Sequence, residues 1–301
     1  MQRYSPRVAG FAARVADAAH SLAAGAGAAV RGGWLTARRG ALGTAAGARG
    51  VVARHRGAGA MLGVGVARLL LQLPADALLL LLARLLSASQ TLLGLEATAR
   101  RLDQGEQALL RRVFGGGIDA RAVRLKVGRL GLLGLPRRAF VVGDVVHVPG
   151  PRRAGAARTS ARNDESMARR APALLVHELT HVWQHQRHGT RYLSECLLAQ
   201  WLGDGYNVAV ALEAERGWAE LNFEQQAELL QCAYAAGWFD EPGAEDDGRR
   251  LLLRLVDARR DDGFAVELAP AAAADEPTPG WHDATPLLRQ GLAAVRAHRG
   301  R

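Results

Sequence analysis

The residues best suited to chemistry in this chain are two histidines and a glutamate in the segment His177-Glu178-Leu179-Thr180-His181. If this segment is helical, His177 and His181 stand four residues apart on one face and can offer two imidazole nitrogens to a single zinc ion. Glu178 lies beside them, where its carboxylate could take a proton from a metal-activated water molecule and return it to a leaving group. The pattern predicts the centre of a zinc-dependent hydrolase, with His177 and His181 as ligands and Glu178 as the catalytic base.

The surrounding residues predict that this segment is a helix packed on one side. Pro172 is tolerated in the first turn of a helix and fits a start there. Apolar residues recur at helical spacing next to the histidines, namely Leu175, Leu179 and Val182. Such a helix can place its back in a core and hold the two ligands at the floor of a cleft. His185 and His188 continue the same face, and we interpret them as residues of its rim.

A catalytic zinc ion usually has three protein ligands, so a third is expected outside this helix. Asn222 followed by Gln225 is typical of a helix start, and Gly237 fits its end. Glu224 and Glu228 lie one turn apart on this second helix, so one carboxylate can bind the metal while the other orients a ligating histidine. By spacing alone, an exposed glutamate pair on an amphipathic helix is an equally good interpretation. Three further glutamates compete for the role of ligand: Glu213, Glu215 and Glu220.

The two segments Val176–Gln184 and Phe223–Glu228 resemble the zincin-like metallopeptidase domains of bacterial proteins that are Vgr-related or associated with contractile injection systems. Those domains carry a His-Glu-x-x-His-x-x-Gln helix, and a later helix of the Glu-x-x-Ala-Asp type supplies the third ligand. The resemblance implies Glu224 as that ligand, with Glu228 standing where Asp is common. It covers about residues 100–240, including a helix that ends in Phe114-Gly115 and short strands. It further implies Zn²⁺ as cofactor, a peptide or protein substrate, and a link to a secretion apparatus.

A small sheet is predicted ahead of the zinc helix. Ala139–Val148 is rich in valine and interrupted by Gly143-Asp144, as expected for a tight hairpin. Residues 150–171 lack a clear period and are interpreted as a flexible loop. A tyrosine in the cleft could stabilise the oxyanion formed at an attacked carbonyl, and Tyr206 and Tyr192 are the candidates, although packing is the commoner role for such residues.

The composition bounds the class of protein. With 301 residues, of which 49% are hydrophobic, the chain can bury the core of one domain and carry extensions. The net charge of +10 suggests acidic partners, but aromatic residues make up only 5% and zinc-finger spacing is absent, which argues against nucleic-acid binding. Cys196 and Cys232 do not form a ligand pair, so buried thiols in a cytoplasmic protein are expected. No signal-peptide core begins near Met1, so export would need a specialised secretion system.

The segments outside residues 100–240 are predicted to be accessory. Residues 1–58 are rich in Arg, Ala and Gly, and we expect disorder or loose helix there. In the leucine-rich residues 59–99, Pro74 interrupts the pattern and the longest charge-free stretch falls short of a membrane span. Two amphipathic helices are therefore expected, docked on the catalytic domain or, as the alternative, on a membrane surface through residues 59–96. Residues 241–301 are predicted to form a helical tail with a Pro/Ala-rich linker.

We therefore expect an α+β fold, mostly helical, in which a zincin-like metallopeptidase core with a small β-sheet follows an N-terminal helical extension. Zinc would be bound by His177, His181 and Glu224, with Glu178 and Tyr206 acting in the hydrolysis of a peptide bond. The alternatives are a non-catalytic interaction or cargo protein of a secretion machine that keeps the zinc fold, and a membrane-surface protein. The Glu178 carboxylate favours the enzyme, because a purely structural zinc ion has no need of it.

Overall fold

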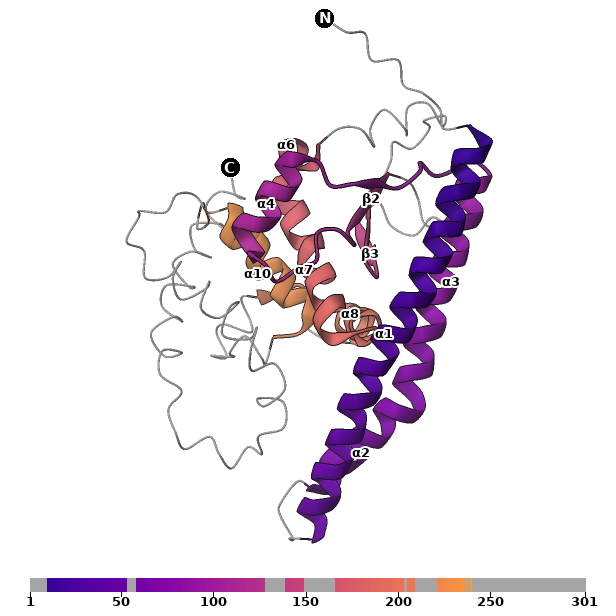
Figure 1. Ribbon diagram of the computed structural model, residues 1–301. Helices are drawn as coiled ribbons and strands as arrows, with labels where there is room; N and C mark the ends of the chain where they lie inside the picture. The colour runs from indigo at the N-terminus through magenta and orange to yellow at the C-terminus, as the bar shows by residue number, and fades with distance from the viewer. Residues whose placement is uncertain are drawn as a thin grey trace, which may run out of the picture.

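The computed structural model describes residues 10–52, 58–127, 139–148, 166–202, 205–208, 221–235, 237 and 239. A long helical hairpin lies along one side of the molecule, and a body of helices with a small sheet lies against it (Figure 1). The described part is thus mostly helical with a four-stranded sheet, which confirms the expected α+β class. The predicted tail, residues 241–301, lies outside the described residues.

The hairpin pairs helix α1, Phe11–Val52, with a second helical arm that runs back along it. That arm consists of α2, Ala58–Ala67, the π-helical turn η1, Arg68–Gln72, and α3, Leu73–Leu92. The two arms are antiparallel, because Gly47 lies against Leu62 near the tip while Gly25 lies against Arg84 further back. A Cβ atom on Gly47 would collide with the backbone nitrogen of Leu62, so the helices approach more closely than larger residues would allow.

Both arms differ from what the sequence suggested. Disorder or loose helix was expected in residues 1–58, yet residues 11–52 form one continuous helix. Alanine favours helix, and small residues let the partner arm pack closely, which stabilises a segment that looks weakly amphipathic by itself. Pro74 does not interrupt the second arm, because it lies in the first turn of α3, directly after η1, where its missing N–H is tolerated.

The sheet has the strand order β1-β2-β4-β3. Its strands are β1, Arg100–Arg101, β2, Arg124–Val127, β3, Phe140–Val142, and β4, Val145–Val148. The antiparallel pair β3–β4 confirms the hairpin predicted around Gly143-Asp144, where Gly143 adopts the positive φ of 62° that the turn requires. β2 pairs parallel with β4 and antiparallel with β1, so the sheet is mixed.

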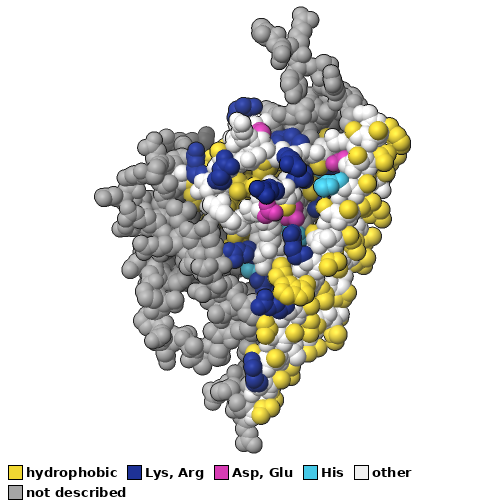
Figure 2. Space-filling model, viewed as in Figure 1, with side chains coloured by type: hydrophobic (Ala, Val, Ile, Leu, Met, Phe, Trp, Pro, Cys, Tyr) yellow, Lys and Arg dark blue, Asp and Glu magenta, His cyan; other side chains and the backbone are white. Residues whose placement is uncertain are grey.

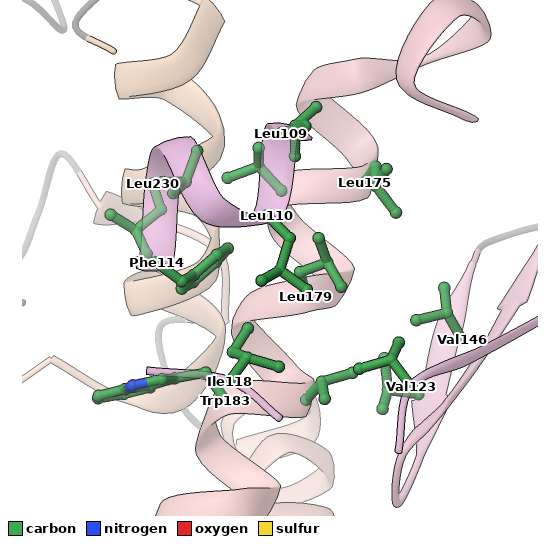
Figure 3. Close-up of a cluster of buried hydrophobic side chains, with 14 of the residues drawn as sticks. Leu109, Leu110, Phe114, Ile118, Val123, Val146, Leu175, Leu179, Trp183 and Leu230 are labelled. Atoms are coloured by element: carbon green, nitrogen blue, oxygen red, sulfur yellow. The ribbon is translucent and has the colours of Figure 1, made fainter. Parts of the chain in front are cut away.

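The main hydrophobic core lies between the sheet and helices that include α4, Gln104–Phe114, α7, Pro172–His188, and α10, Phe223–Ala235. Figure 3 shows Leu110 and Phe114 of α4 meeting Leu179 of α7, with Val146 of the sheet on the other side. Helix α4, Gln104–Phe114, begins with a reciprocal cap between Asp103 and Glu106 and ends at Gly115, as expected. The short helix α6, Met167–Arg170, lies in part of the predicted loop, and residues 149–165 lie outside the described residues.

Three further helices complete the body. α7, Pro172–His188, begins at the predicted proline and is followed by Gly189 with a φ of 77°. α8, Arg191–Leu202, comes next, and α10, Phe223–Ala235, packs on α7. The predicted start of α10 is confirmed, because the Asn222 side chain accepts a hydrogen bond from the Gln225 amide and the Gln225 side chain accepts one from the Asn222 amide.

A buried polar network joins the hairpin to the sheet. The Lys126 ammonium on β2 donates hydrogen bonds to the hydroxyls of Ser87 and Thr91 on α3. It also lies 3.1 Å from the Glu96 carboxylate, and the Ser87 hydroxyl donates to the same carboxylate at 2.7 Å. A buried ammonium group without partners is strongly unfavourable, so this network fixes the position of β2 relative to α3.

Candidate metal centre

Three side chains from two helices converge inside the body. The Nε2 atoms of His177 and His181, both on α7, lie 3.6 Å and 3.5 Å from Glu224 Oε2 on α10. One ligand atom from each residue lies within 4.8 Å of the other two, and all three side chains are buried. The structure therefore brings together the three residues predicted as zinc ligands, and this triad could bind a metal ion.

The Glu224 carboxylate is poised to accept a cation. Its Oε1 atom accepts a hydrogen bond from Gln200 Nε2 of α8 at 2.7 Å. Its Oε2 atom is buried and has no hydrogen-bond partner among the described residues, yet it faces both imidazoles. Leaving a buried carboxylate oxygen unpaired is costly, so a cation at this position would relieve a penalty that the fold otherwise carries.

Gln184 fixes the orientation of His181. The Gln184 amide nitrogen donates to the Phe223 carbonyl at 2.9 Å and to Gln226 Oε1 at 3.0 Å, so its oxygen must face the opposite way. That oxygen lies 2.8 Å from His181 Nδ1 and accepts its proton. His181 Nε2 is thereby left as the lone-pair nitrogen that points toward Glu224, which is the tautomer a metal ligand needs.

Glu228 lies behind the other histidine. Its Oε2 atom is 3.8 Å from His177 Nδ1, on the side of the ring opposite to Glu224. A carboxylate at this position favours the proton on Nδ1 and leaves Nε2 for the metal. The structure thus separates the positions of the two glutamates of α10, with Glu224 facing the Nε2 atoms of both histidines and Glu228 facing Nδ1 of His177.

The charges of the triad are coupled. Burial by itself lowers the pKa of His181, but the neighbouring Cys196 and Glu224 raise it well above its ordinary value. Burial by itself raises the pKa of Glu224, whereas the charge of His181, the nearby His177 imidazole and the hydrogen bond from Gln200 hold it below its ordinary value. In the absence of a cation the centre therefore favours an imidazolium beside a carboxylate, so a bound metal ion would replace a proton.

Glu178 is buried beside the triad. Burial raises its pKa, as does the charge of Glu224, while His177 and His181 act in the opposite direction. Its Oε2 atom has no hydrogen-bond partner among the described residues. A buried carboxylate with a raised pKa and a free oxygen can accept and release a proton, which is the chemistry predicted for it.

The structure separates the two candidate tyrosines. The Tyr206 ring lies 5.9 Å from the His177 ring, centroid to centroid, and is partly exposed, so it borders the centre. Tyr192 is buried elsewhere, where its hydroxyl donates to the Val141 carbonyl at 3.1 Å and accepts from the Gly143 amide at 2.8 Å. Tyr192 therefore packs against the β3–β4 hairpin and holds its turn in place.

The expected position of His185 is corrected by the structure, whereas the competing glutamates cannot be placed. His185 was interpreted as a rim residue, but only 1% of it is exposed, and it packs edge-on against the Tyr192 ring. The reason is that the turn at Gly143-Asp144, together with side chains of α3 packed on it, lies against the His185 imidazole, and periodicity in α7 cannot reveal this contact. Glu213, Glu215 and Glu220 all lie outside the described residues.

No family model and no solved structure matches this chain. A stretch of 137 residues is 34% identical to the type VI secretion system spike protein VgrG2b of Pseudomonas aeruginosa strain PAO1. The chain is similar to part of a secretion spike protein. The match covers 44% of this chain but only 12% of the spike protein, so it relates this chain to a small part of that protein.

Some residues of the centre carried no distinct signal in the sequence. Gln184 stands three residues after His181, a spacing that puts it on the same face, and this could have suggested its role. Gln200 and Cys196 come from α8, and nothing in their local pattern marks them as neighbours of the triad. Cys196 Sγ lies 3.7 Å from His181 Nδ1 and is buried.

Proposed function

We propose that this chain is a zinc-dependent metallopeptidase of the zincin type that hydrolyses peptide bonds. The observation that carries the proposal is the convergence of His177 Nε2, His181 Nε2 and Glu224 Oε2, with Glu178 next to the first ligand. Two imidazoles and one carboxylate suit zinc, and a set of three protein ligands is the usual one for a catalytic rather than a structural ion. A buried glutamate beside such a set has no purpose at a structural site.

The residues of the centre have separate tasks in this proposal. A bound zinc ion would polarise the scissile carbonyl and lower the pKa of a water molecule. Glu178 would accept the proton of that water at its free oxygen and pass it to the leaving amine. The Tyr206 hydroxyl, on a ring that borders His177, would donate a hydrogen bond to the oxyanion that develops on the substrate. Gln184 and Glu228 would hold the two imidazoles in the tautomer that binds the metal.

The setting of this activity is a secretion system in our proposal. The similarity to the type VI secretion system spike protein VgrG2b supports this link. The chain would be delivered by, or assemble with, such a machine as its enzymatic part, and a peptide or protein would be its substrate. This part of the proposal is independent of the metal chemistry, since a non-catalytic cargo or interaction protein could have the same link.

The test combines metal analysis with a cleavage assay on the full chain. Wild-type protein should hold one zinc ion per chain and cleave members of a broad peptide library. Glu178→Gln should keep the zinc and lose hydrolysis, because Glu178 is proposed as the base and not as a ligand. Glu195→Gln on α8, which removes a glutamate that pairs with Arg191 outside the triad, is the matched control and should keep both properties.

Two results would change the assignment. Loss of zinc in Glu178→Gln would make Glu178 a ligand or a structural residue. Wild-type protein that holds zinc but cleaves no peptide would favour the non-catalytic cargo or interaction protein.

A further inference from the structure

The hairpin has one apolar face that is not covered by any described part of the chain. We call this surface the outer face. On the second arm its largest members are the leucines at positions 70, 71, 78, 81, 82 and 85, with between 44% and 70% of each exposed. Figure 2 shows hydrophobic side chains along the edge of the hairpin that faces away from the body.

The outer face of the second arm has no exposed charge. Between Leu62 and Leu92 every exposed residue is apolar or glycine, except Ser89. The charged residues of this stretch are Arg68, which is partly buried, and Asp76 and Arg84, which are buried. A surface of this size without charge is unusual for a protein that meets only water, and it marks a site of interaction.

The polar groups of the hairpin are directed to the body instead. Asp76 accepts a hydrogen bond from the Ser194 amide of α8 at 3.0 Å, and Gln72 donates to Ser194 and Glu195. On α1, Arg39 donates to the Arg187 carbonyl at 3.1 Å. These bonds fix which side of the hairpin meets the body, so the apolar side is left outward.

The first arm adds exposed apolar residues and one arginine to the apolar side of the hairpin. Val15, Leu22 and Val30 of α1 are 42%, 40% and 76% exposed. Further along, Trp34 is 58% exposed and the Arg38 guanidinium lies over its ring at 5.4 Å. Tryptophan and arginine are the residues that settle at the boundary between acyl chains and headgroups, the arginine reaching toward anionic phosphate.

We propose that the outer face binds the surface of an anionic lipid bilayer, with the hairpin lying flat in the interface and the body in water. The helix Leu62–Leu92 has 31 residues and a mean hydropathy of 1.9 in its most apolar window, of which only 17% is buried. At about 1.5 Å per residue it is longer than the roughly 30 Å hydrocarbon core, so length alone would permit it to span the membrane.

The packing of the body favours the flat arrangement. Contacts with the body extend along the hairpin from Arg39 to Gln72 and Asp76 and on to the network around Lys126. A hairpin that spanned the membrane in this state would draw those charged groups of the body into hydrocarbon. Lying flat, the same hairpin places only its uncharged face among the acyl chains. The inference does not depend on the proposed peptidase activity.

Vesicle flotation of the full chain tests this proposal. Wild-type protein should float with vesicles of 70% phosphatidylcholine and 30% phosphatidylglycerol. The triple variant Leu78→Asn, Leu82→Asn, Leu85→Asn removes three exposed leucines of one helix face and should bind about a hundredfold more weakly. The matched control is Leu197→Asn, Leu198→Asn, Trp201→Asn, which removes three exposed apolar residues of α8 and should bind like wild type.

Two further measurements are needed to interpret the flotation results: the helix content of each variant and the oligomeric state of the chain. Circular dichroism should show unchanged helix content in the triple variant, and the corresponding triple alanine variant, which favours helix, replaces it if helix is lost. Binding by the triple variant equal to that of wild type, or a monomeric wild-type chain that stays off the vesicles, would overturn the proposal. A wild-type dimer that the triple variant converts to a monomer would instead assign the outer face to a second copy.

Discussion

The Gln184 side-chain amide contacts both the metal centre and the core, so substitutions of Gln184 can separate an effect on metal affinity from an effect on stability. Its oxygen accepts from His181 Nδ1 at 2.8 Å, while its nitrogen donates to the Phe223 carbonyl and to Gln226. Gln184→Leu removes both functions. Gln184→Glu keeps an oxygen for His181 and removes only the donor. A difference between these two variants therefore reports on the bond to the histidine.

The magnitudes follow from these bonds. Loss of the partner that orients a ligating histidine typically lowers metal affinity ten- to a hundredfold, which corresponds to about 1.4 to 2.7 kcal/mol. Gln184→Leu should show this loss, whereas Gln184→Glu should stay within about threefold of wild type because a carboxylate orients the ring equally well. Both variants leave the Phe223 carbonyl without its donor, so each should lower the free energy of unfolding by about 1 to 3 kcal/mol.

Competition with a chromophoric zinc chelator measures the affinity, and urea unfolding of the metal-free protein measures the stability. Gln226→Leu is the control, since it removes one partner of the Gln184 amide without touching His181 and should lower stability more than affinity. The reasoning would be refuted by a folded Gln184→Leu protein with wild-type zinc affinity, because His181 would then be oriented by another group.

Three further predictions concern the centre and the hairpin. Glu224→Ala should remove most of the zinc, whereas Glu228→Ala should weaken binding about ten- to a hundredfold; metal analysis after dialysis checks both, and full occupancy in Glu224→Ala would contradict the assignment. Zinc binding near pH 7 should release about one proton because the pKa of His181 is raised, which titration calorimetry in two buffers of different ionisation enthalpy detects; equal heats would argue against it. Burial raises the pKa of Asp76 to about 6, so the folded state holds its proton more tightly and stability falls as the pH rises from about 4 to 6. Asp76→Asn should remove that slope and stabilise the protein at pH 7 by about 3 kcal/mol, and unfolding curves that keep the slope would exclude Asp76 as its source.

Elements with strong local signals could be predicted from the sequence. Pro172 begins α7, the Asn222–Gln225 pair begins α10, and the turn at Gly143-Asp144 joins β3 to β4. Each signal acts within a few residues, through φ restriction, capping or a turn. The spacing of His177 and His181 on α7 is likewise a local property, so their shared direction followed once the helix was predicted.

Features that depend on distant partners could not be predicted in this way. The parallel pairing of β2 with β4 joins residues about twenty positions apart. The burial of His185 depends on elements that precede α7 in the chain, and the stability of α1 depends on a second arm that meets it through glycine contacts. Gln200 reaches Glu224 from a third helix. Such arrangements result from packing, which local propensity and periodicity do not encode.

The buried polar network between the hairpin and the sheet protects the Lys126 ammonium group from reagents that modify amines. Lys126 is the one lysine in the sequence, and only 1% of it is exposed, since α3 and Glu96 cover its ammonium group. In the docked state a lysine-directed label therefore cannot reach the Lys126 ammonium group. Lys126 would react only when the hairpin separates from the sheet, so the fraction of chains labelled at Lys126 would measure the fraction of undocked molecules without any engineered probe.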